Sequence, residues 1–152
     1  MSDDGALTLL GFCLDGQRFC VHSGLVREVL PMLPLRLLSR PPPSVVGVVD
    51  VRGALLTVLD PRPRLHLPMR APQLSSHLIH VECEGRQLCL LVDFADELFR
   101  VQHRDVCRPG ELEARVPYGL GLVKLADGSD SVLIELSALV SQDEWGALVD
   151  AR

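Results

Sequence analysis

One arginine stands where the sequence predicts a tight turn. Arg52 and Gly53 separate two apolar, β-branched runs, residues 47–51 and Ala54–Leu59, which we interpret as the strands of a hairpin. Glycine suits the positive φ just after such a turn, because it has no Cβ to clash with the reversing backbone. A guanidinium at the tip of a hairpin cannot belong to the core. Arg52 is therefore either a local ion-pair partner or a recognition group.

Glu28 is the carboxylate that we expect to approach Arg52. It lies between Val26 and Leu30 in a predicted strand over residues 24–30. In our hypothesis the carboxylate orients the guanidinium at the surface through charge-assisted hydrogen bonds. The alternative is an exposed ion pair that contributes little to stability. Spacing alone favours neither interpretation.

The cysteines and histidines do not form a recognisable catalytic or metal site. Five cysteines make an odd set without a Cys-x-x-Cys pair, which favours reduced, buried thiols over disulfides or zinc. Across a turn at Asp15-Gly16, Cys13 lies opposite Arg18 and diagonal to Cys20, at about 7–8 Å, too far for an unstrained disulfide. The sets are Cys13, Cys20, Cys83, Cys89 and Cys107, and His22, His66, His77, His80 and His103.

No enzyme motif accompanies these residues. His77 and His80, three apart in a predicted strand, point to opposite faces and make a poor metal pair. A Gly-rich phosphate loop is also missing from the sequence. We therefore predict no catalytic residue, no metal and no cofactor.

Composition limits the remaining classes. The 152 residues are 47% hydrophobic but only 4% aromatic, which indicates one well-packed globular domain or two fused halves. A net charge of −5 argues against nucleic-acid binding, which needs a basic face. The start of the chain is acidic, unlike a signal peptide. Asp50 and Arg52 interrupt the longest apolar region, far short of the roughly 20 residues of a membrane span. We expect a soluble, cytoplasmic protein without membrane insertion.

Strands dominate the rest of the first half. Residues 7–14 and Gln17–His22 form a predicted hairpin about Asp15-Gly16, with Phe12 opposite Phe19 in the core. Prolines between residues 31 and 43 leave room for an extended piece at residues 35–38 and one helical turn after Pro43. Residues 61–76 are predicted to be a loop.

The second half repeats the first. Laying Glu84-Gly85 over Asp15-Gly16 aligns Leu88 with Phe19, Cys89 with Cys20, Glu97 with Glu28 and Leu98 with Val29. Further on, residues 121–125 match 47–51, and residues 132–135 match 57–60. The repeat predicts two similar small β-barrels. Arg52 is not repeated, because the matching turn reads Ala126-Asp127-Gly128.

A helix is predicted near the C-terminus. Residues 141–144, Ser-Gln-Asp-Glu, form a capping box, and Trp145, Leu148 and Val149 follow at helical spacing. We interpret Trp145 as the packing anchor of this helix.

These residues resemble the CheW family of chemotaxis coupling proteins. Asp50-Val51-Arg52-Gly53 matches the family's asparagine-leucine-arginine-glycine, and Val26-Arg27-Glu28-Val29 matches its valine-x-glutamate-isoleucine. The Pro-x-x-Val-Val-Gly47 run, Asp60, the residues 91–93, Glu97-Leu98, Gly121 and a closing strand at residues 133–136 continue the match. The resemblance covers about residues 7–149.

The resemblance implies an all-β fold of two five-stranded SH3-like barrels with a short C-terminal helix. The family domain would span residues 7–149 after a tail at 1–6. One barrel would take about residues 25–70, and the other about 77–140 plus the N-terminal strands. Members of the family lack enzymatic activity. They couple the cytoplasmic hairpin tip of methyl-accepting chemoreceptors to the regulatory domain of the CheA histidine kinase, in arrays at the inner membrane.

The resemblance also assigns partner-binding residues. Glu28 and Arg52 match the paired charges needed for coupling. Val26, Leu78, Cys89 and Leu98 match positions of the receptor-binding groove, and Val46 and Leu55 lie near the surface that joins adaptor and kinase, or adaptor copies, into rings. Core burial is the alternative role for these apolar residues.

Departures from the family pattern suggest a divergent member. Asp50 replaces an asparagine and either competes with Glu28 for the guanidinium or changes which partner the tip accepts. Pro61, Glu135 and Cys89 also depart from the pattern. One alternative is therefore a scaffold for a non-flagellar pathway such as surface motility. Another, from a different class, is a small-ligand-binding or oligonucleotide-binding β-barrel; scarce aromatics disfavour stacking on single strands.

Overall fold

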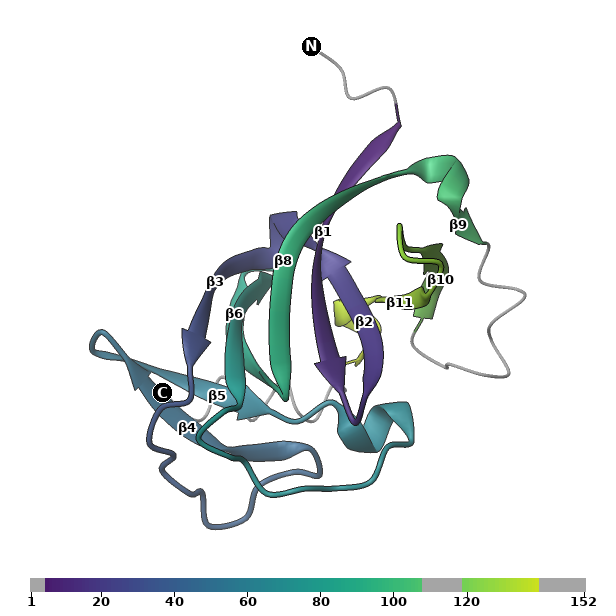
Figure 1. Ribbon diagram of the computed structural model, residues 1–152. Coiled ribbons are helices and arrows are strands. Elements are labelled where there is room, and N and C mark those ends of the chain that lie inside the picture. Colours follow the sequence, from purple (N-terminus) through teal and green to yellow (C-terminus); the bar gives the residue numbers. More distant parts are fainter. Residues whose placement is uncertain (1–4, 108–118, 140–152) are drawn as a thin grey trace.

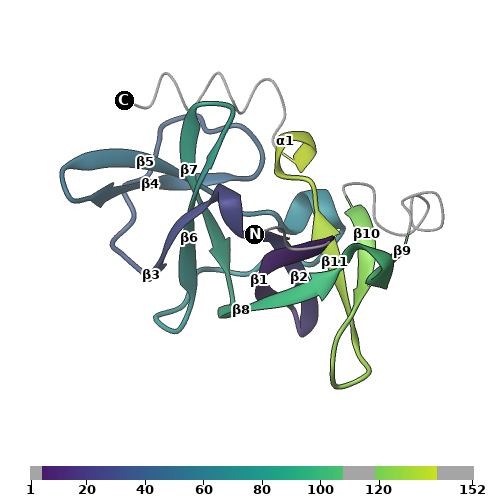
Figure 2. The same ribbon diagram turned by 90° about the horizontal axis from the view of Figure 1, so that it is seen from above.

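Short strands in two sheets make up most of the described structure (Figures 1 and 2). The computed structural model describes residues 5–107 and 119–139. Its strands are β1 (Ala6–Leu14), β2 (Gln17–His22), β3 (Val26–Pro31), β4 (Val45–Val51), β5 (Ala54–Leu59), β6 (His77–Cys83), β7 (Arg86–Val92), β8 (Phe94–Gln102), β9 (Val106–Cys107), β10 (Gly119–Lys124) and β11 (Asp130–Ile134). Its helices are three 3₁₀ turns, η1 (Ser23–Leu25), η2 (Arg62–Leu65) and η3 (His103–Asp105), and the one-turn α1 (Leu136–Leu139).

Each sheet takes its central hairpin from the other half of the chain. The sheet that we call sheet A has the order β8-β1-β2-β11-β10-β9, and sheet B has the order β3-β6-β7-β5-β4. Strands β2 and β11 pair in parallel, as do β7 and β5, while the other neighbours are antiparallel. The all-β fold with two sheets is thus confirmed.

The pairing registers support the predicted internal repeat. The alignment at the hairpin turns places Ile79 over Leu10 and Leu98 over Val29. In the structure Leu10 lies opposite Leu98 in sheet A, and Ile79 lies opposite Val29 in sheet B. Two hairpins of Val and Leu could be overlaid by chance, but chance would not reproduce this register.

Two equivalent glycines allow an outer segment to approach each sheet closely. A Cβ at Gly47 would lie 2.7 Å from the carbonyl oxygen of Arg36, which bridges to β4. At Gly121 a Cβ would lie 2.6 Å from the carbonyl oxygen of Cys107 in β9. Only glycine fits such an approach without moving the backbone.

The described residues form three apolar clusters, of which one joins the two sheets. The largest draws on both sheets and contains the stacked rings of Phe12 and Phe19, whose centroids lie 5.8 Å apart, as the predicted hairpin register requires. Sheet B has its own cluster around Val58, Leu78 and Cys89. Sheet A has a smaller one around Leu9 and Val123.

Several predicted boundaries were wrong. Neither sheet closes into a barrel within residues 5–107 and 119–139, and β6 and β7 lie in sheet B, not with the later residues of the predicted second barrel. The β6–β7 hairpin belongs to sheet B because β7 pairs in parallel with β5.

Some predicted element boundaries also differ. The closing strand ends at Ile134, where α1 follows, and Ser23–Leu25 is a 3₁₀ turn before β3. Ser44, after Pro43, has φ 79° and starts no helix. The predicted loop contains η2. The predicted helix at residues 141–149 lies outside the described residues.

Candidate functional site

The β4–β5 turn holds Arg52 at its tip. Val51 pairs with Ala54, so Arg52 and Gly53 are the two turn residues, with φ angles of 52° and 89°. Two positive φ values define the two-residue turn whose twist matches the flanking strands. The corresponding positions of the β1–β2 and β6–β7 turns carry acids, Asp15 and Glu84, also at positive φ. This turn alone among the three presents a cation instead of an anion.

Both carboxylate oxygens of Glu28 accept hydrogen bonds from the Arg52 guanidinium. Nη1 of Arg52 donates to Oε2 of Glu28 at 3.2 Å, and Nη2 donates to Oε1. The Arg52 side chain is nevertheless 68% exposed, and that of Glu28 is 32% exposed. The predicted approach of the two residues is confirmed. The fork-to-carboxylate geometry fixes the direction of the guanidinium while leaving much of it open to a partner.

The same contact keeps both groups charged. Hydrogen bonding to Arg52 lowers the pKa of Glu28, and the Glu28 carboxylate in turn raises the pKa of Arg52. Each group favours the charged form of the other. The pair therefore stays ionised across neutral pH and presents a constant charge pattern at the surface.

Asp50 stabilises the β4–β5 turn by a hydrogen bond to the turn backbone. Its Oδ1 accepts a hydrogen bond from the backbone N–H of Gly53 at 2.7 Å. Of the two roles considered for Asp50, competition with Glu28 for the guanidinium is therefore not what the structure shows. Asp50 is exposed, so it still adds a negative charge beside Arg52.

The apolar residues assigned to a receptor groove have different environments. Leu98, on edge strand β8, is 59% exposed, and Val26 on β3 is half-buried against the core shared by the sheets. Leu78 and Cys89 are completely buried in the sheet B cluster. Burial accounts for their apolar character, and their role in partner binding stays a prediction.

Other exposed apolar side chains lie on the same two edge strands. Val29 on β3, the repeat equivalent of Leu98, is 39% exposed, and Phe94 at the start of β8 is 50% exposed. Sequence reasoning missed Val29 and Phe94 as candidates. The signal for Val29 was its alignment with Leu98.

The two residues assigned to a ring surface lie on sheet B. Val46 on β4 is half-buried against the sheet B cluster, and Leu55 on β5 is 36% exposed. Strand β4 is an edge of sheet B among the residues that the structure describes, and Arg36 bridges to it at Val48. These placements leave the ring assignment a prediction.

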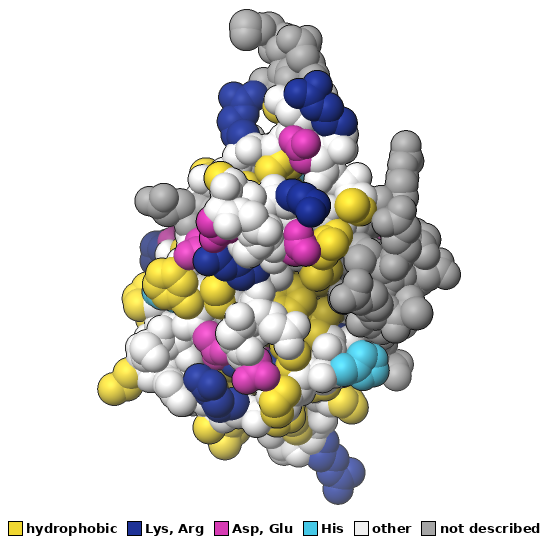
Figure 3. Space-filling view, turned by 45° about the vertical axis from the view of Figure 1, so that its right-hand side comes forward, with side chains coloured by type: hydrophobic (Ala, Val, Ile, Leu, Met, Phe, Trp, Pro, Cys, Tyr) yellow, Lys and Arg dark blue, Asp and Glu magenta, His cyan; other side chains and the backbone are white. Residues whose placement is uncertain are grey.

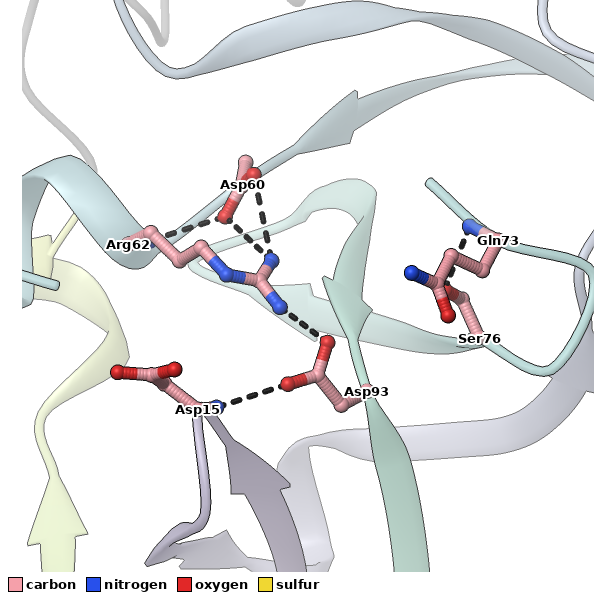
Figure 4. Close-up of polar contacts among 6 residues, drawn as sticks. All are labelled: Asp15, Asp60, Arg62, Gln73, Ser76 and Asp93. Carbon is pink, nitrogen blue, oxygen red and sulfur yellow. Dashed lines mark hydrogen bonds and ion pairs between the residues drawn. The ribbon is translucent and has the colours of Figure 1, made fainter. Parts of the chain in front are cut away.

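Sequence reasoning also missed a set of polar contacts around a buried arginine, which we call the Arg62 clasp and define as Asp15, Asp60, Arg62 and Asp93 (Figure 4). Arg62 is 2% exposed and Asp60 1%. Nη1 of Arg62 lies 3.3 Å from Oδ1 of Asp60, and Nη2 donates to Oδ1 of Asp93. The other Asp93 oxygen accepts the backbone N–H of Asp15 at 2.8 Å. The sequence signal was weak: an aspartate directly after each of the buried strands β5 and β7.

The pKa values of Asp60 and Asp93 are shifted in opposite directions. Burial raises the pKa of Asp60, and the bonds from Arg62 offset this only in part. Burial also acts to raise the pKa of Asp93, but the Asp15 N–H and the Arg62 guanidinium outweigh it and lower that pKa. Asp93 is thus the carboxylate that the fold holds as an anion.

The five thiols are free. Cys20, Cys83 and Cys89 are buried, and burial raises the pKa of Cys20 to about 11 and that of Cys89 to about 12. Such thiols are small core residues and not nucleophiles at neutral pH.

The surface and the helices add two observations. On the face shown in Figure 3, basic and acidic side chains lie interspersed with apolar ones, without the single-sign field that nucleic-acid binding needs. Over the described residues, no helix has the length and apolar character to cross a membrane.

Comparison with known proteins gives one family. A family model for the CheW-like domain matches residues 8–144. A chemotaxis protein CheW of Rhizobium meliloti is 28% identical over 93% of this chain and 92% of that protein. A probable chemotaxis protein CheW of Rhizobium etli is 27% identical over the same shares.

A solved structure agrees with these sequence matches. The crystal structure of the scaffolding protein TtCheW from Thermoanaerobacter tengcongensis superimposes with a TM-score of 0.80 at 21% identity, over 91% of this chain and 94% of that one. At that identity the similarity establishes the fold. The chain belongs to the CheW-like domain family, whose members are non-catalytic scaffold and adaptor proteins of chemotaxis.

Proposed function

We propose that this adaptor couples methyl-accepting chemoreceptors to a CheA-type histidine kinase in a cytoplasmic array at the inner membrane. One observation carries the proposal: Glu28 holds the exposed Arg52 guanidinium in a fixed direction at the tip of the β4–β5 turn. A pair that served only stability would not need to sit on a turn that disfavours arginine. The oriented cation suits a carboxylate on a partner.

The receptor would contact the apolar edge strands. Val29 on β3 and Phe94 and Leu98 on β8 expose apolar surface that an amphipathic helical hairpin can cover. Val26, on the same strand as Val29, is half-buried. No reaction occurs on the adaptor; the signal passes as a change in the relative placement of receptor and kinase.

The kinase would contact sheet B. Edge strand β4 with Val46, and the neighbouring Leu55 of β5, offer backbone and apolar groups to a regulatory domain of similar fold. The same surface would serve rings with the kinase or with further copies of the adaptor.

A three-component binding assay tests the proposal. Purified kinase regulatory domain is mixed with a bead-bound receptor cytoplasmic fragment, with and without this protein. We expect the kinase domain to be retained only when the adaptor is present. Equal retention without the adaptor, or no adaptor on the receptor beads, would overturn the proposal.

Asp50 favours a divergent partner set. Where the family pattern has a neutral asparagine, this chain places a carboxylate that caps the turn beside Arg52. A kinase or receptor matched to this tip would belong to a separate pathway, such as surface motility. Asp50→Asn should then improve binding to partners from a standard flagellar array; unchanged binding would argue against a separate partner set.

A ligand-binding module is the candidate from another class. A cavity of about 490 Å³ opens on sheet A and is lined by Phe99, Val101 and Leu125, together with the cations Arg18 and Lys124. A rise in melting temperature with a small metabolite, in a chain that fails the three-component assay, would favour this function instead.

A further inference from the structure

We propose that Arg62 is a positioning residue for partner binding, because it fixes the relative orientation of sheets A and B. The inference rests on the proposed function, in which the receptor contacts β3 of sheet B and β8 of sheet A together. It concerns a residue that touches neither partner, since Arg62 is 2% exposed.

The clasp joins segments that belong to different sheets. Asp60 follows β5 in sheet B, and Arg62 lies in η2, directly after it. Asp15 is a turn residue of the β1–β2 hairpin in sheet A. Asp93 links the two segments, because one of its carboxylate oxygens accepts a hydrogen bond from the Arg62 guanidinium and the other accepts the backbone N–H of Asp15 (Figure 4). A single guanidinium thus connects the end of β5 to the hairpin turn of the opposite sheet.

Asp93 is also the residue at which the chain changes sheets. Strand β7 of sheet B ends at Val92, and β8 of sheet A begins at Phe94. The Asp93 backbone N–H donates to the carbonyl oxygen of Cys13 at 3.1 Å, a second link to β1. The clasp therefore sets the point from which β8 departs, and with it the position of Phe94 and Leu98 relative to β3.

The geometry needs the fork of an arginine. Arg62 contacts Asp60 with Nη1 and with its backbone N–H, at 3.3 and 3.0 Å to Oδ1, and reaches Asp93 with Nη2. A lysine ammonium in the same place is a single point of charge without the planar fork, so it cannot reproduce the two-sided contact. Arg62→Lys keeps the charge but should lose the fixed connection.

Loss of this connection should weaken the binding of a partner that spans both sheets more than the binding of one that contacts a single sheet. The proposed receptor surface includes β3 and β8, whereas the proposed kinase surface lies on β4 and β5 of sheet B alone. A change in sheet orientation therefore predicts a split between the two affinities. General destabilisation predicts no such split.

Residual dipolar couplings test the orientation without any partner. We expect backbone couplings from both sheets of the wild-type chain to fit one alignment tensor. In Arg62→Lys each sheet should still fit well by itself, but the two should need different tensors. Asp93→Asn provides a second variant, because its amide oxygen can still accept the Asp15 N–H while the charge facing Arg62 is gone. One shared wild-type tensor in both folded variants would overturn the proposal.

Binding measurements complete the test. Arg62→Lys should weaken binding of the receptor fragment at least fivefold more than binding of the kinase regulatory domain. The matched control is Val58→Ala, which opens a cavity in the sheet B cluster but leaves Arg62 and both of its carboxylate partners in place. It should leave the ratio of the two affinities within twofold of wild type.

Two outcomes separate the claims. Equal weakening for both partners in Arg62→Lys, or the same split in Val58→Ala, would overturn the positioning role. A wild-type chain that binds no receptor fragment would overturn the proposed function and the binding half of this inference. The dipolar couplings would then still decide whether Arg62 sets the sheet orientation.

Discussion

Replacing Arg62 by methionine should destabilise the protein severely. Methionine keeps much of the length and apolar stem of arginine but leaves Asp60 and Asp93 without their cation. Removing one partner of a buried ion pair costs about 3–5 kcal/mol, because the remaining charge is buried and uncompensated. A domain of this kind has a free energy of unfolding of about 5–15 kcal/mol, so the loss is a large fraction.

The expected loss has a measurable size and a pH signature. At about 2–4 °C per kcal/mol for a chain of this length, the melting temperature should fall by about 6–20 °C. Burial already raises the folded-state pKa of Asp60 above its ordinary value in the wild type, and loss of the Arg62 guanidinium raises it further. Folding then takes up a proton, so the variant gains stability as the pH falls. The deficit relative to wild type should be smaller near pH 4 than at pH 7.

Urea unfolding at several pH values provides the assay, with Arg27→Met as the control. Arg27 pairs with Glu82 at the surface, where its side chain is 55% exposed, so that variant should change the unfolding free energy little at any pH. A deficit for Arg62→Met below about 1 kcal/mol, or one that is the same at pH 4 and pH 7, would refute the reasoning about the clasp.

Three further outcomes follow from burial and close approach. Gly47→Ala should cost about 1–3 kcal/mol in urea unfolding, because its Cβ would lie 2.7 Å from the Arg36 carbonyl oxygen; an unchanged midpoint would contradict this. The pKa of Asp93 is lowered below its ordinary 3.8, so the stability it contributes is present above that pH and lost as the pH falls through its folded value. Asp93→Asn should therefore flatten the acid limb of the stability curve. Cys20 and Cys89 should react with a thiol reagent at pH 8 only on unfolding; rapid reaction of either would contradict their burial.

Local patterns predicted the hairpins because turn chemistry and period-two alternation act over a few residues. The Asp15-Gly16 turn fixed Cys13 opposite Arg18 and Phe12 opposite Phe19, as observed. The contact of Glu28 with Arg52 was proposed from the sequence as a hypothesis, and the structure confirms it.

Contacts between segments far apart in the chain could not be predicted from these local patterns. That the β6–β7 hairpin enters sheet B depends on its parallel contact with β5, which no local signal encodes. Arg62 lies between two prolines and resembles an exposed loop residue in the sequence. Its burial follows only when Asp60 and Asp93, at the ends of two strands far apart in the chain, converge on it. The complete burial of Leu78 and Cys89, by contrast, agrees with the core role that their apolar character allowed.

The most direct test of the central claim is the three-component assay with Arg52→Ala beside Arg27→Ala. Both variants remove an exposed arginine that pairs with a glutamate, and both arginines belong to sheet B, Arg27 on β3 and Arg52 in the β4–β5 turn. We predict that Arg52→Ala keeps the wild-type melting temperature within about 2 °C, as expected for an exposed pair, while kinase retention on receptor beads is lost. Arg27→Ala should retain the kinase. Full retention by Arg52→Ala, with or without a fall in melting temperature, would contradict the claim that Arg52 recognises a partner.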